Sequence, residues 1–247
     1  MEKKKITENL LYILYQPYKW FVFLPFLIVN TLFFSSAAVL TASIIGQKPA
    51  SLFGTAWSRV NAFFTPIFVK ISGKENIQKN TSYIIVCNHQ SYYDIFLIYG
   101  WLGIDFKWVM KKELRKMPGI GISCAKLGHI FIDRSNTQAA IESMNAVKQK
   151  LVNGTSVVIF PEGTRSETGN LGPFKKGAFK MAFDTGLSVL PITLIGTKDV
   201  FPSKSVNLLP GKVRMVIHKP VDINNYKEEE IDTLMTDVGT VISSALV

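Results

Sequence analysis

The feature that most constrains this chain is an uncharged apolar run near its N-terminus. From Trp20 to Gly46 the sequence contains no Asp, Glu, Lys or Arg. As one straight helix this run would be about 40 Å long, enough to cross a hydrocarbon core of about 30 Å. A secretory signal peptide would have a shorter apolar region and a cleavage site of small residues. The run therefore predicts a membrane anchor rather than a cleaved leader.

The anchor can cross the membrane once or fold back within one leaflet. Pro25 interrupts the hydrogen-bond ladder of a helix, and Asn30-Thr31 and Ser35-Ser36 offer polar break points near the middle. Two halves of about 10 to 14 residues would each be too short to cross. Both flanks are basic, whereas a single span normally shows a charge bias between its ends. We favour a re-entrant anchor over a single span, at the cytoplasmic face of the cell membrane.

Residues 50–71 form a second N-terminal segment with mixed character. Its apolar residues, which alternate with Arg59 and Lys70, are Leu52, Phe53, Trp57, Phe63, Phe64, Ile67 and Phe68. This pattern is typical of an amphipathic helix at a membrane interface. We therefore divide the chain into an N-terminal membrane anchor with an interfacial helix, residues 1–73, and a globular domain, residues 74–247.

Charge narrows the class of partner. The chain has 28 Lys and Arg against 18 Asp and Glu, a net charge of +10, so a polyanion is the expected partner. Hydrophobic residues make up 47% of the chain, which favours a membrane with anionic lipids over nucleic acid. The two cysteines, Cys87 and Cys124, belong to no Cys/His cluster with metal-binding spacing. We therefore expect membrane lipids as partners, no nucleic acid and no metal.

After Gly73 short β-rich segments alternate with helical patterns. Candidate strands, most of them continuous apolar runs, are residues 83–87, 106–110, 129–133, 157–160, 189–194 and 213–218. Such runs are typical of strands covered on both faces. Residues 135–151 predict a helix between the third and fourth strands, and residues 226–246 predict a C-terminal helix. This order indicates an α/β fold, a largely parallel mixed sheet flanked by helices.

The first candidate site follows the first of these strands, where residues 88–94 read NHQSYYD. Ligands bind at the carboxyl ends of strands in open α/β sheets. His89 there can accept a hydroxyl proton near neutral pH, and Asp94 can orient its ring and stabilise the imidazolium. The alternative is structural, because Ser91 and Asp94 also fit a capping box at the start of a helix. The motif alone leaves both interpretations open.

A second cluster follows another apolar strand, where residues 160–166 read FPEGTRS. This loop displays an arginine and two hydroxyls, and a guanidinium binds phosphate through two parallel hydrogen bonds. Lys175 and Lys176 follow at the start of a helix, whose N-terminus also attracts anions. The pattern predicts a phosphate site. A surface turn with a solvated basic helix is the alternative for either segment alone.

Taken together, these segments resemble the glycerophospholipid acyltransferases, most closely the bacterial lysophosphatidate (1-acyl-sn-glycerol-3-phosphate) acyltransferases. The resemblance covers roughly residues 80 to 200 and rests on five blocks in order: NHQSYYD (88–94), KKEL (111–114), FIDR (131–134), FPEGTR (160–165) and LPIT (190–193). It implies transfer of a fatty acyl group to the sn-2 hydroxyl of 1-acyl-sn-glycerol 3-phosphate (lysophosphatidic acid), giving phosphatidic acid for phospholipid biosynthesis. An acyl carrier protein or coenzyme A thioester would be the co-substrate, with no other cofactor.

The resemblance also implies roles for the matching residues. His89 would be the general base and Asp94 its orienting partner. The implied substrate-binding residues are Lys111, Arg134, Glu162, Gly163, Thr164 and Arg165. Lys111 would lie near the acyl or phosphate group, and the others would form the site for the acceptor phosphate.

Other functions remain open at this point. The same phosphate cluster would serve an acyltransferase that acts on glycerol 3-phosphate or another lysolipid. A serine esterase using Ser91 belongs to a different class, although the sequence has no GxSxG motif at that serine. A catalytically silent membrane-binding protein is disfavoured by the intact His89, Asp94 and Arg165. His129 and His218 lie on predicted strands without a nearby acid, so we interpret both as structural.

Overall fold

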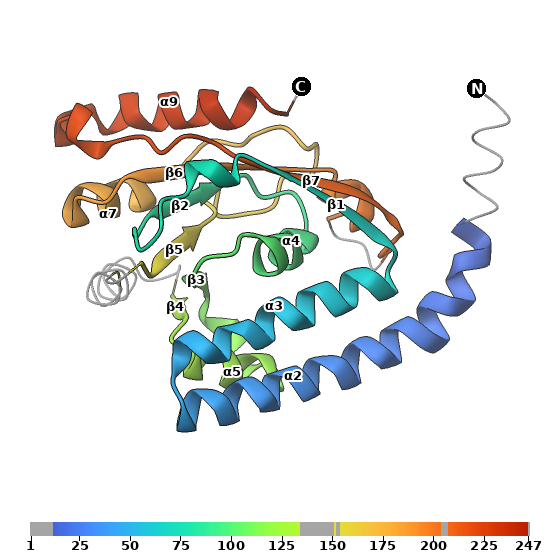
Figure 1. Cartoon of the computed structure of the whole chain (residues 1–247). Helices are drawn as coiled ribbons and strands as arrows, with labels where there is room; N and C mark the ends of the chain where they lie inside the picture. The colour runs from blue at the N-terminus through green and yellow to red at the C-terminus, as the bar shows by residue number, and fades with distance from the viewer. Residues whose placement is uncertain (1–11, 134–150, 152–153, 204–206, 247) are drawn as a thin grey trace, which may run out of the picture.

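The computed structural model describes residues 12–133, 151, 154–203 and 207–246. Its sheet consists of β1 Ile67–Ser72, β2 Ile84–Cys87, β3 Phe106–Lys111, β4 Ile130–Ile132, β5 Ser156–Ile159, β6 Val189–Ile195 and β7 Gly211–Ile217. The strand order is β1-β7-β6-β2-β5-β3-β4, and each neighbouring pair is parallel except β6 and β7 (Figure 1). The predicted largely parallel mixed sheet is therefore confirmed.

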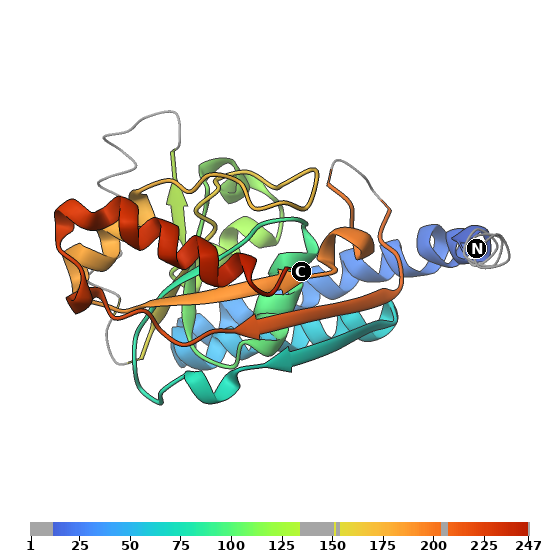
Figure 2. The same ribbon diagram turned by 90° about the horizontal axis from the view of Figure 1, so that it is seen from above.

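Helices cover both faces of this sheet. They are α2 Leu24–Ile44, α3 Gln47–Phe64, α4 Tyr93–Trp101, α5 Ile120–Lys126, α7 Gly177–Thr185, α8 Thr197–Val200 and α9 Ile231–Ser243. Figure 1 shows α9 above the sheet and α2 and α3 below it, and Figure 2 looks down onto α9. α9 confirms the predicted C-terminal helix, whereas the helix predicted over residues 135–151 falls almost entirely outside the described residues.

The central strands are buried on both faces, as their continuous apolar sequences predict. In β2 the side chains of Ile85 and Cys87 join the core that includes α4, and those of Ile84 and Val86 join the core beneath α7 and α9. All four are fully buried. The end of β2 is thus held rigidly between two cores, and the first residues after it leave the sheet at its carboxyl edge.

The amphipathic helix predicted over residues 50–71 is wrong at its C-terminal end. α3 ends at Phe64, and β1 follows as an edge strand that pairs with β7. Pro66 cannot continue a helix, and the β-branched Ile67, Val69 and Ile71 alternate with more exposed residues at the period of a strand. The sheet therefore begins within residues 1–73, the segment assigned to the anchor.

The N-terminal segment is a pair of helices joined by a short turn. The first helix runs from Tyr12 to Ile44 and includes a π-helical turn, η1 Lys19–Phe23, before α2. The chain turns at Ile45 and Gly46 and returns as α3, which packs beside α2. The helix break predicted near Asn30-Thr31 or Ser35-Ser36 is therefore wrong, because the first helix continues through both positions.

Two polar residues of α2, Thr31 and Ser35, have partners on other helices. Thr31 Oγ1 donates to the carbonyl of Leu27 at 2.6 Å and accepts from Trp57 Nε1 of α3 at 3.0 Å. Ser35 Oγ lies 3.5 Å from Ser123 Oγ of α5. Pro25 falls at the start of α2, directly after the π-helical turn, where a locally wider helix accommodates a residue without an N–H.

Candidate functional site

His89 lies directly after β2, at the carboxyl edge of the sheet. The preceding residue, Asn88, fixes this position: its Nδ2 donates to Leu194 O at 2.9 Å, and its Oδ1 accepts from Leu194 N at 2.7 Å. An amide side chain thus extends the pairing with β6 beyond the end of β2. On the other side, Ser166 N donates to His89 O at 2.8 Å. The histidine backbone is therefore tied to segments from both neighbouring strands.

The side chains of His89 and Asp94 are in direct contact. His89 Nδ1 lies 2.7 Å from Asp94 Oδ2, and Asp94 is fully buried. The same oxygen accepts the N–H groups of Gln90 at 2.8 Å and Ser91 at 2.9 Å. A carboxylate oxygen with these donors accepts a hydrogen bond from Nδ1, so the proton of the neutral ring sits on Nδ1. Nε2 is then the ring nitrogen that can take a proton from a substrate.

The two interpretations of Asp94 turn out to be compatible. Ser91 Oγ accepts the Tyr93 N–H at 2.9 Å while Asp94 accepts the Ser91 N–H, so both side chains satisfy backbone N–H groups at the turn into α4, although Ser91 does not make the bond to the Asp94 N–H that defines a capping box. Asp94 Oδ2 contacts His89 at the same time. The cap therefore holds in place the carboxylate that orients the imidazole.

Ser91 is poorly placed to act as a nucleophile. Its side chain is fully buried, and its hydroxyl donates to the carbonyl of Phe201 at 2.6 Å while it accepts from Tyr93 N. A catalytic serine needs its hydroxyl within hydrogen-bond reach of the base and exposed to the substrate. The contacts of Ser91 therefore argue against the serine esterase that the sequence left open.

An aromatic stack supports the imidazole of His89. Its ring lies 3.9 Å from the ring of Phe160, with an interplanar angle of 12°. Phe160 in turn stacks on Trp108 of β3 at 5.8 Å and 22°. The stack restrains rotation of the imidazole and lays an apolar surface beside it. Sequence reasoning did not assign a role to Phe160, although it opens the FPEGTR block.

Arg165 lies in the loop after β5 that is bonded to His89 through Ser166. Its guanidinium carbon lies 3.5 Å from the centroid of the Tyr92 ring, a close cation–π contact. Its Nη1 is buried and has no hydrogen-bond partner among the described residues. A buried guanidinium nitrogen without an acceptor is costly unless a ligand supplies one. The predicted phosphate-binding arginine thus has a donor to offer near His89.

The side chains of the three residues before Arg165 do not offer a buried donor as Arg165 does. Gly163 has a φ of 75°, the left-handed conformation that turns the chain, and Thr164 is exposed. Glu162 is buried, and its two oxygens accept backbone N–H groups of His89 and Gly172, at 2.7 and 2.8 Å. Burial raises the pKa of Glu162, and the two N–H donors oppose that rise. Its oxygens therefore already have partners within the protein.

The four remaining predicted cations are placed in four different ways. Lys111 is exposed at the end of β3, on the same edge of the sheet where β2 and β5 end. Arg134 lies outside the described residues. Lys175 lies beside Gly163, where an added Cβ would be 3.0 Å from the lysine Nζ. Lys176, in contrast, pairs with Asp232 of α9 at 2.8 Å, so it is not brought to the site.

The two other histidines have structural partners, as predicted. His129 is buried, accepts the Trp108 N–H on Nδ1 at 3.2 Å and bonds Tyr99 through Nε2. His218 Nε2 lies 2.8 Å from Thr193 Oγ1.

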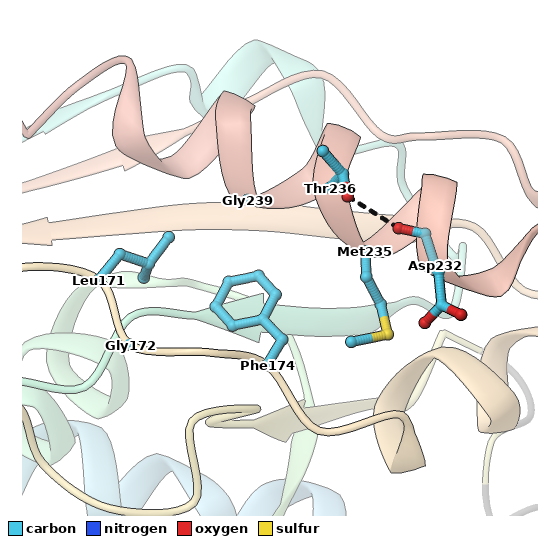
Figure 3. A pocket seen from close by; sticks show the side chains of 7 residues that line it. All are labelled: Leu171, Gly172, Phe174, Asp232, Met235, Thr236 and Gly239. Atoms are coloured by element: carbon cyan, nitrogen blue, oxygen red, sulfur yellow. Dashed lines mark hydrogen bonds between the residues drawn. The ribbon is translucent and has the colours of Figure 1, made fainter.

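A surface groove of about 320 Å³ lies between α9 and the segment before α7 (Figure 3). It is lined by Leu171, Gly172, Phe174, Asp232, Met235, Thr236 and Gly239. None of the predicted site residues lines it. The arrangement around His89 is therefore separate from this groove, although Gly172 contributes to both through its N–H.

Comparisons with known proteins agree with this geometry. Residues 68–195 match the family model described as Acyltransferase. The Arabidopsis thaliana protein named 1-acyl-sn-glycerol-3-phosphate acyltransferase LPAT1, chloroplastic, is 38% identical over 76% of this chain and 56% of its own length. The Brassica napus protein named 1-acyl-sn-glycerol-3-phosphate acyltransferase BAT2, chloroplastic, is 38% identical over 76% and 58%. The chain thus spans little more than half the length of these two relatives.

A solved structure matches nearly the whole chain. It is the crystal structure of the 1-acyl-sn-glycerophosphate (LPA) acyltransferase, PlsC, from Thermotoga maritima. The TM-score is 0.76 at 30% identity, over 96% of this chain and 94% of that one.

Proposed function

Because the chain belongs to the Acyltransferase family, as the match over residues 68–195 and the similarity to PlsC establish, we propose that it acylates lysophosphatidic acid. The acyl group of a thioester would pass to the sn-2 hydroxyl of 1-acyl-sn-glycerol 3-phosphate, and the product would be phosphatidic acid. The observation that carries the proposal is the His89–Asp94 pair with Arg165 on a loop bonded to the same histidine. The names of the relatives support this acceptor.

The proposed mechanism is direct transfer with His89 as the general base. Nε2 takes the proton from the acceptor hydroxyl while the hydroxyl oxygen attacks the thioester carbonyl. The carbon–sulfur bond then breaks, and the proton held on Nε2 passes to the leaving thiolate of coenzyme A or acyl carrier protein, which returns His89 to its neutral form. Asp94 holds Nδ1–H and stabilises the imidazolium formed in between. A thioester is already activated, so the proposal needs no covalent acyl-enzyme and no resident cofactor.

Arg165 is the proposed receptor for the acceptor phosphate. Its stacking on Tyr92 fixes the plane of the guanidinium and leaves its nitrogen edge for an anion. The unpartnered Nη1 is the donor that a phosphate oxygen would satisfy. Lys111, Arg134, Gly163 and Thr164 remain predicted contributors to substrate binding. Either coenzyme A or acyl carrier protein can supply the thioester in this proposal.

The exposed apolar surface of the N-terminal helices supports a membrane location. Among the residues that the structure describes, one helix, Tyr12–Ile44, is long and apolar enough to cross a membrane. Large apolar side chains exposed on this helix and on α3 include Phe21, Ile28, Val29, Phe33, Leu40, Leu52 and Phe63. In water such a surface would be unfavourable, because it leaves a large contiguous apolar area hydrated. We propose that this surface is embedded in the bilayer.

The contacts of the first helix favour a re-entrant placement over a single span. Near its N-terminal end, Lys19 Nζ bonds Asn207 Oδ1 at 3.2 Å. Near its C-terminal end, Ala38 packs with Leu127, which follows α5. A helix that crossed the bilayer would carry its ends to opposite sides of about 30 Å of hydrocarbon. Both ends here touch the domain that carries His89, so we propose that the helix lies within the cytoplasmic leaflet.

A basic segment beside α2 would assist this placement. Met117 and Ile122 are exposed in or next to α5, and α5 packs against α2 at Gly119, where an added Cβ would lie 3.1 Å from Leu32. The exposed cations of the same segment are Arg115, Lys116 and Lys126. Apolar side chains flanked by cations suit the interface of an anionic membrane.

The anchor can be tested by labelling in sealed vesicles. We expect single cysteines introduced by Lys5→Cys and Lys79→Cys to react with a membrane-impermeant maleimide from the same side, because both flanks would be cytoplasmic. Cys124→Ser is the background, since Cys87 is fully buried. Detergent-opened vesicles control for access. Labelling from opposite sides would establish a single span and remove the re-entrant proposal.

The reaction itself can be tested with a labelled acyl thioester and purified protein in detergent. With lysophosphatidic acid we expect labelled phosphatidic acid, and without it we expect little thiol release and no protein-bound acyl group. Ser91→Ala is expected to keep transfer, because that hydroxyl bonds the Phe201 carbonyl and not the base. Label bound to the protein before product forms, and lost in Ser91→Ala, would support the esterase class instead.

A further inference from the structure

Glu162 lies at the junction of three segments that come from distant parts of the sequence. It belongs to the loop after β5, and its Oε1 accepts the N–H of His89, 73 residues away, at 2.7 Å. Its Oε2 accepts the N–H of Gly172 at 2.8 Å. Only 8% of the surface of Glu162 is exposed to solvent. One buried carboxylate therefore joins the histidine loop, its own loop and the segment that leads into α7.

The glycine at position 172 is suited to its close contact with Glu162. At Gly172 an added Cβ would lie 3.0 Å from Glu162 Oε2, so a side chain there would press against the carboxylate. Glycine permits the close approach of its backbone N–H. Gly172 also lines the groove shown in Figure 3, so the same carboxylate ties the wall of that groove to His89.

These contacts do not fit a ligand of the acceptor phosphate. Each carboxylate oxygen already accepts a backbone N–H, and a carboxylate would repel a phosphate rather than bind it. Phosphate needs donors, which Arg165 supplies in this loop and Glu162 does not. The resemblance placed Glu162 with the substrate-binding residues because it adjoins Gly163, Thr164 and Arg165 in the sequence.

Glu162 restrains His89 at its backbone. The hydrogen bond to His89 N complements the contact of Asp94 with the side chain and the bond from Ser166 to the carbonyl, so the residue is held at three points. Glu162 also lies close enough to His89 for the charge of the histidine to favour the carboxylate form of Glu162.

We infer that Glu162 is a positioning residue: its carboxylate fixes the backbone of His89 relative to its own loop and to Gly172, and it does not bind the acceptor. This inference rests on the proposed role of His89 as the base. It predicts that loss of these two hydrogen bonds lowers turnover more than it weakens binding of lysophosphatidic acid.

Glu162→Gln tests this inference. The amide keeps the size of the side chain, but its NH₂ group would face one of two backbone N–H donors, so one of the two hydrogen bonds is lost. We expect kcat to fall by about 10-fold or more, with KM for lysophosphatidic acid changed less than about threefold.

Glu162→Asp and Glu167→Gln are the matched variants. Aspartate keeps the charge on a shorter side chain that would not reach both N–H groups, so it should also lower kcat with little change in KM. Glu167 is an exposed acid of the same loop, and Glu167→Gln should leave kcat and KM unchanged. The NMR resonance of the His89 backbone amide, whose proton bonds Glu162 Oε1, should shift in Glu162→Gln, and it measures the contact without any assay of turnover.

The outcomes separate this inference from the proposed function. If the wild-type protein failed to acylate lysophosphatidic acid, the proposed function would fall while the His89 amide resonance still tested the contact with Glu162. If the wild-type protein were active and folded Glu162→Gln kept the wild-type kcat, the inference alone would be overturned. A large rise in KM for lysophosphatidic acid, with no such rise for monoacylglycerol, would also overturn it and restore Glu162 as an acceptor ligand.

Discussion

Replacing His89 with alanine is expected to lower turnover by about 10²- to 10⁴-fold, the loss typical of a missing general base. The reason is geometric: Asp94 accepts the hydrogen bond from the Nδ1–H of His89, so Nε2 is the nitrogen left to take the proton of the substrate. Binding of lysophosphatidic acid should change little, because the phosphate contacts belong to Arg165. Steady-state kcat and a separate measurement of lysolipid binding in detergent would check both parts.

Asp94→Asn provides the companion result. Asp94 Oδ2 accepts hydrogen bonds from His89, Gln90 and Ser91. In Asp94→Asn the NH₂ group of the amide would either face these N–H donors or hold the imidazole in the wrong tautomer. Turnover should again be much reduced in folded protein. Ser91→Ala, which removes a hydroxyl of the same loop, should stay within a few-fold of wild type. Near-wild-type turnover in His89→Ala or Asp94→Asn would reduce Asp94 to a helix cap.

Arg165→Ala is expected to depress kcat/KM for lysophosphatidic acid by roughly 10- to 150-fold, the equivalent of about 1.5–3 kcal/mol for a charge-assisted contact. The effect should be specific to an acceptor with a phosphate, because the unpartnered Nη1 has nothing to bind on a monoacylglycerol. Arg165→Lys should recover only part, since an ammonium keeps the charge but cannot make the bidentate contact. Paired kcat/KM values for the two acceptors would measure this.

Lys176→Ala is the matched control for that experiment. Lys176 is also a cation near the FPEGTR block in sequence, but it pairs with Asp232 on α9. It should therefore affect both acceptors little. If Arg165→Ala slowed lysophosphatidic acid and monoacylglycerol equally, the arginine would support the fold or the thioester, and the acceptor assignment would lose its main physical support.

The catalytic pair could be predicted because its geometry is local. His89 and Asp94 are five residues apart on one strand-to-helix connection, and the bond from the Ser91 N–H to Asp94 helps to bring them together. The six strands from β2 to β7 were likewise predictable, because most of them are continuous apolar runs, typical of strands covered on both faces. β1 was missed because its apolar residues follow those of α3 without a change in composition, although Pro66 and the alternation of Ile67, Val69 and Ile71 were local signals of a strand.

The remaining differences come from contacts between distant segments. The break expected in α2 is absent because Trp57 and Ser123 lie beside Thr31 and Ser35, which no local pattern reveals. Glu162 adjoins phosphate-binding residues in sequence, yet both its oxygens face backbone N–H groups of other loops. In each case the partner of a polar group decides its role, and that partner is set by the tertiary fold.

The central claim is that this site acylates an acceptor that carries a phosphate. The most direct measurement is a competition in detergent among lysophosphatidic acid, glycerol 3-phosphate, a phosphate-free monoacylglycerol and water, with one acyl thioester and products identified by mass. We predict phosphatidic acid as the main product, with far less acylation of monoacylglycerol and little free fatty acid. Equal or greater acylation of monoacylglycerol, or free fatty acid as the main product, would contradict the account.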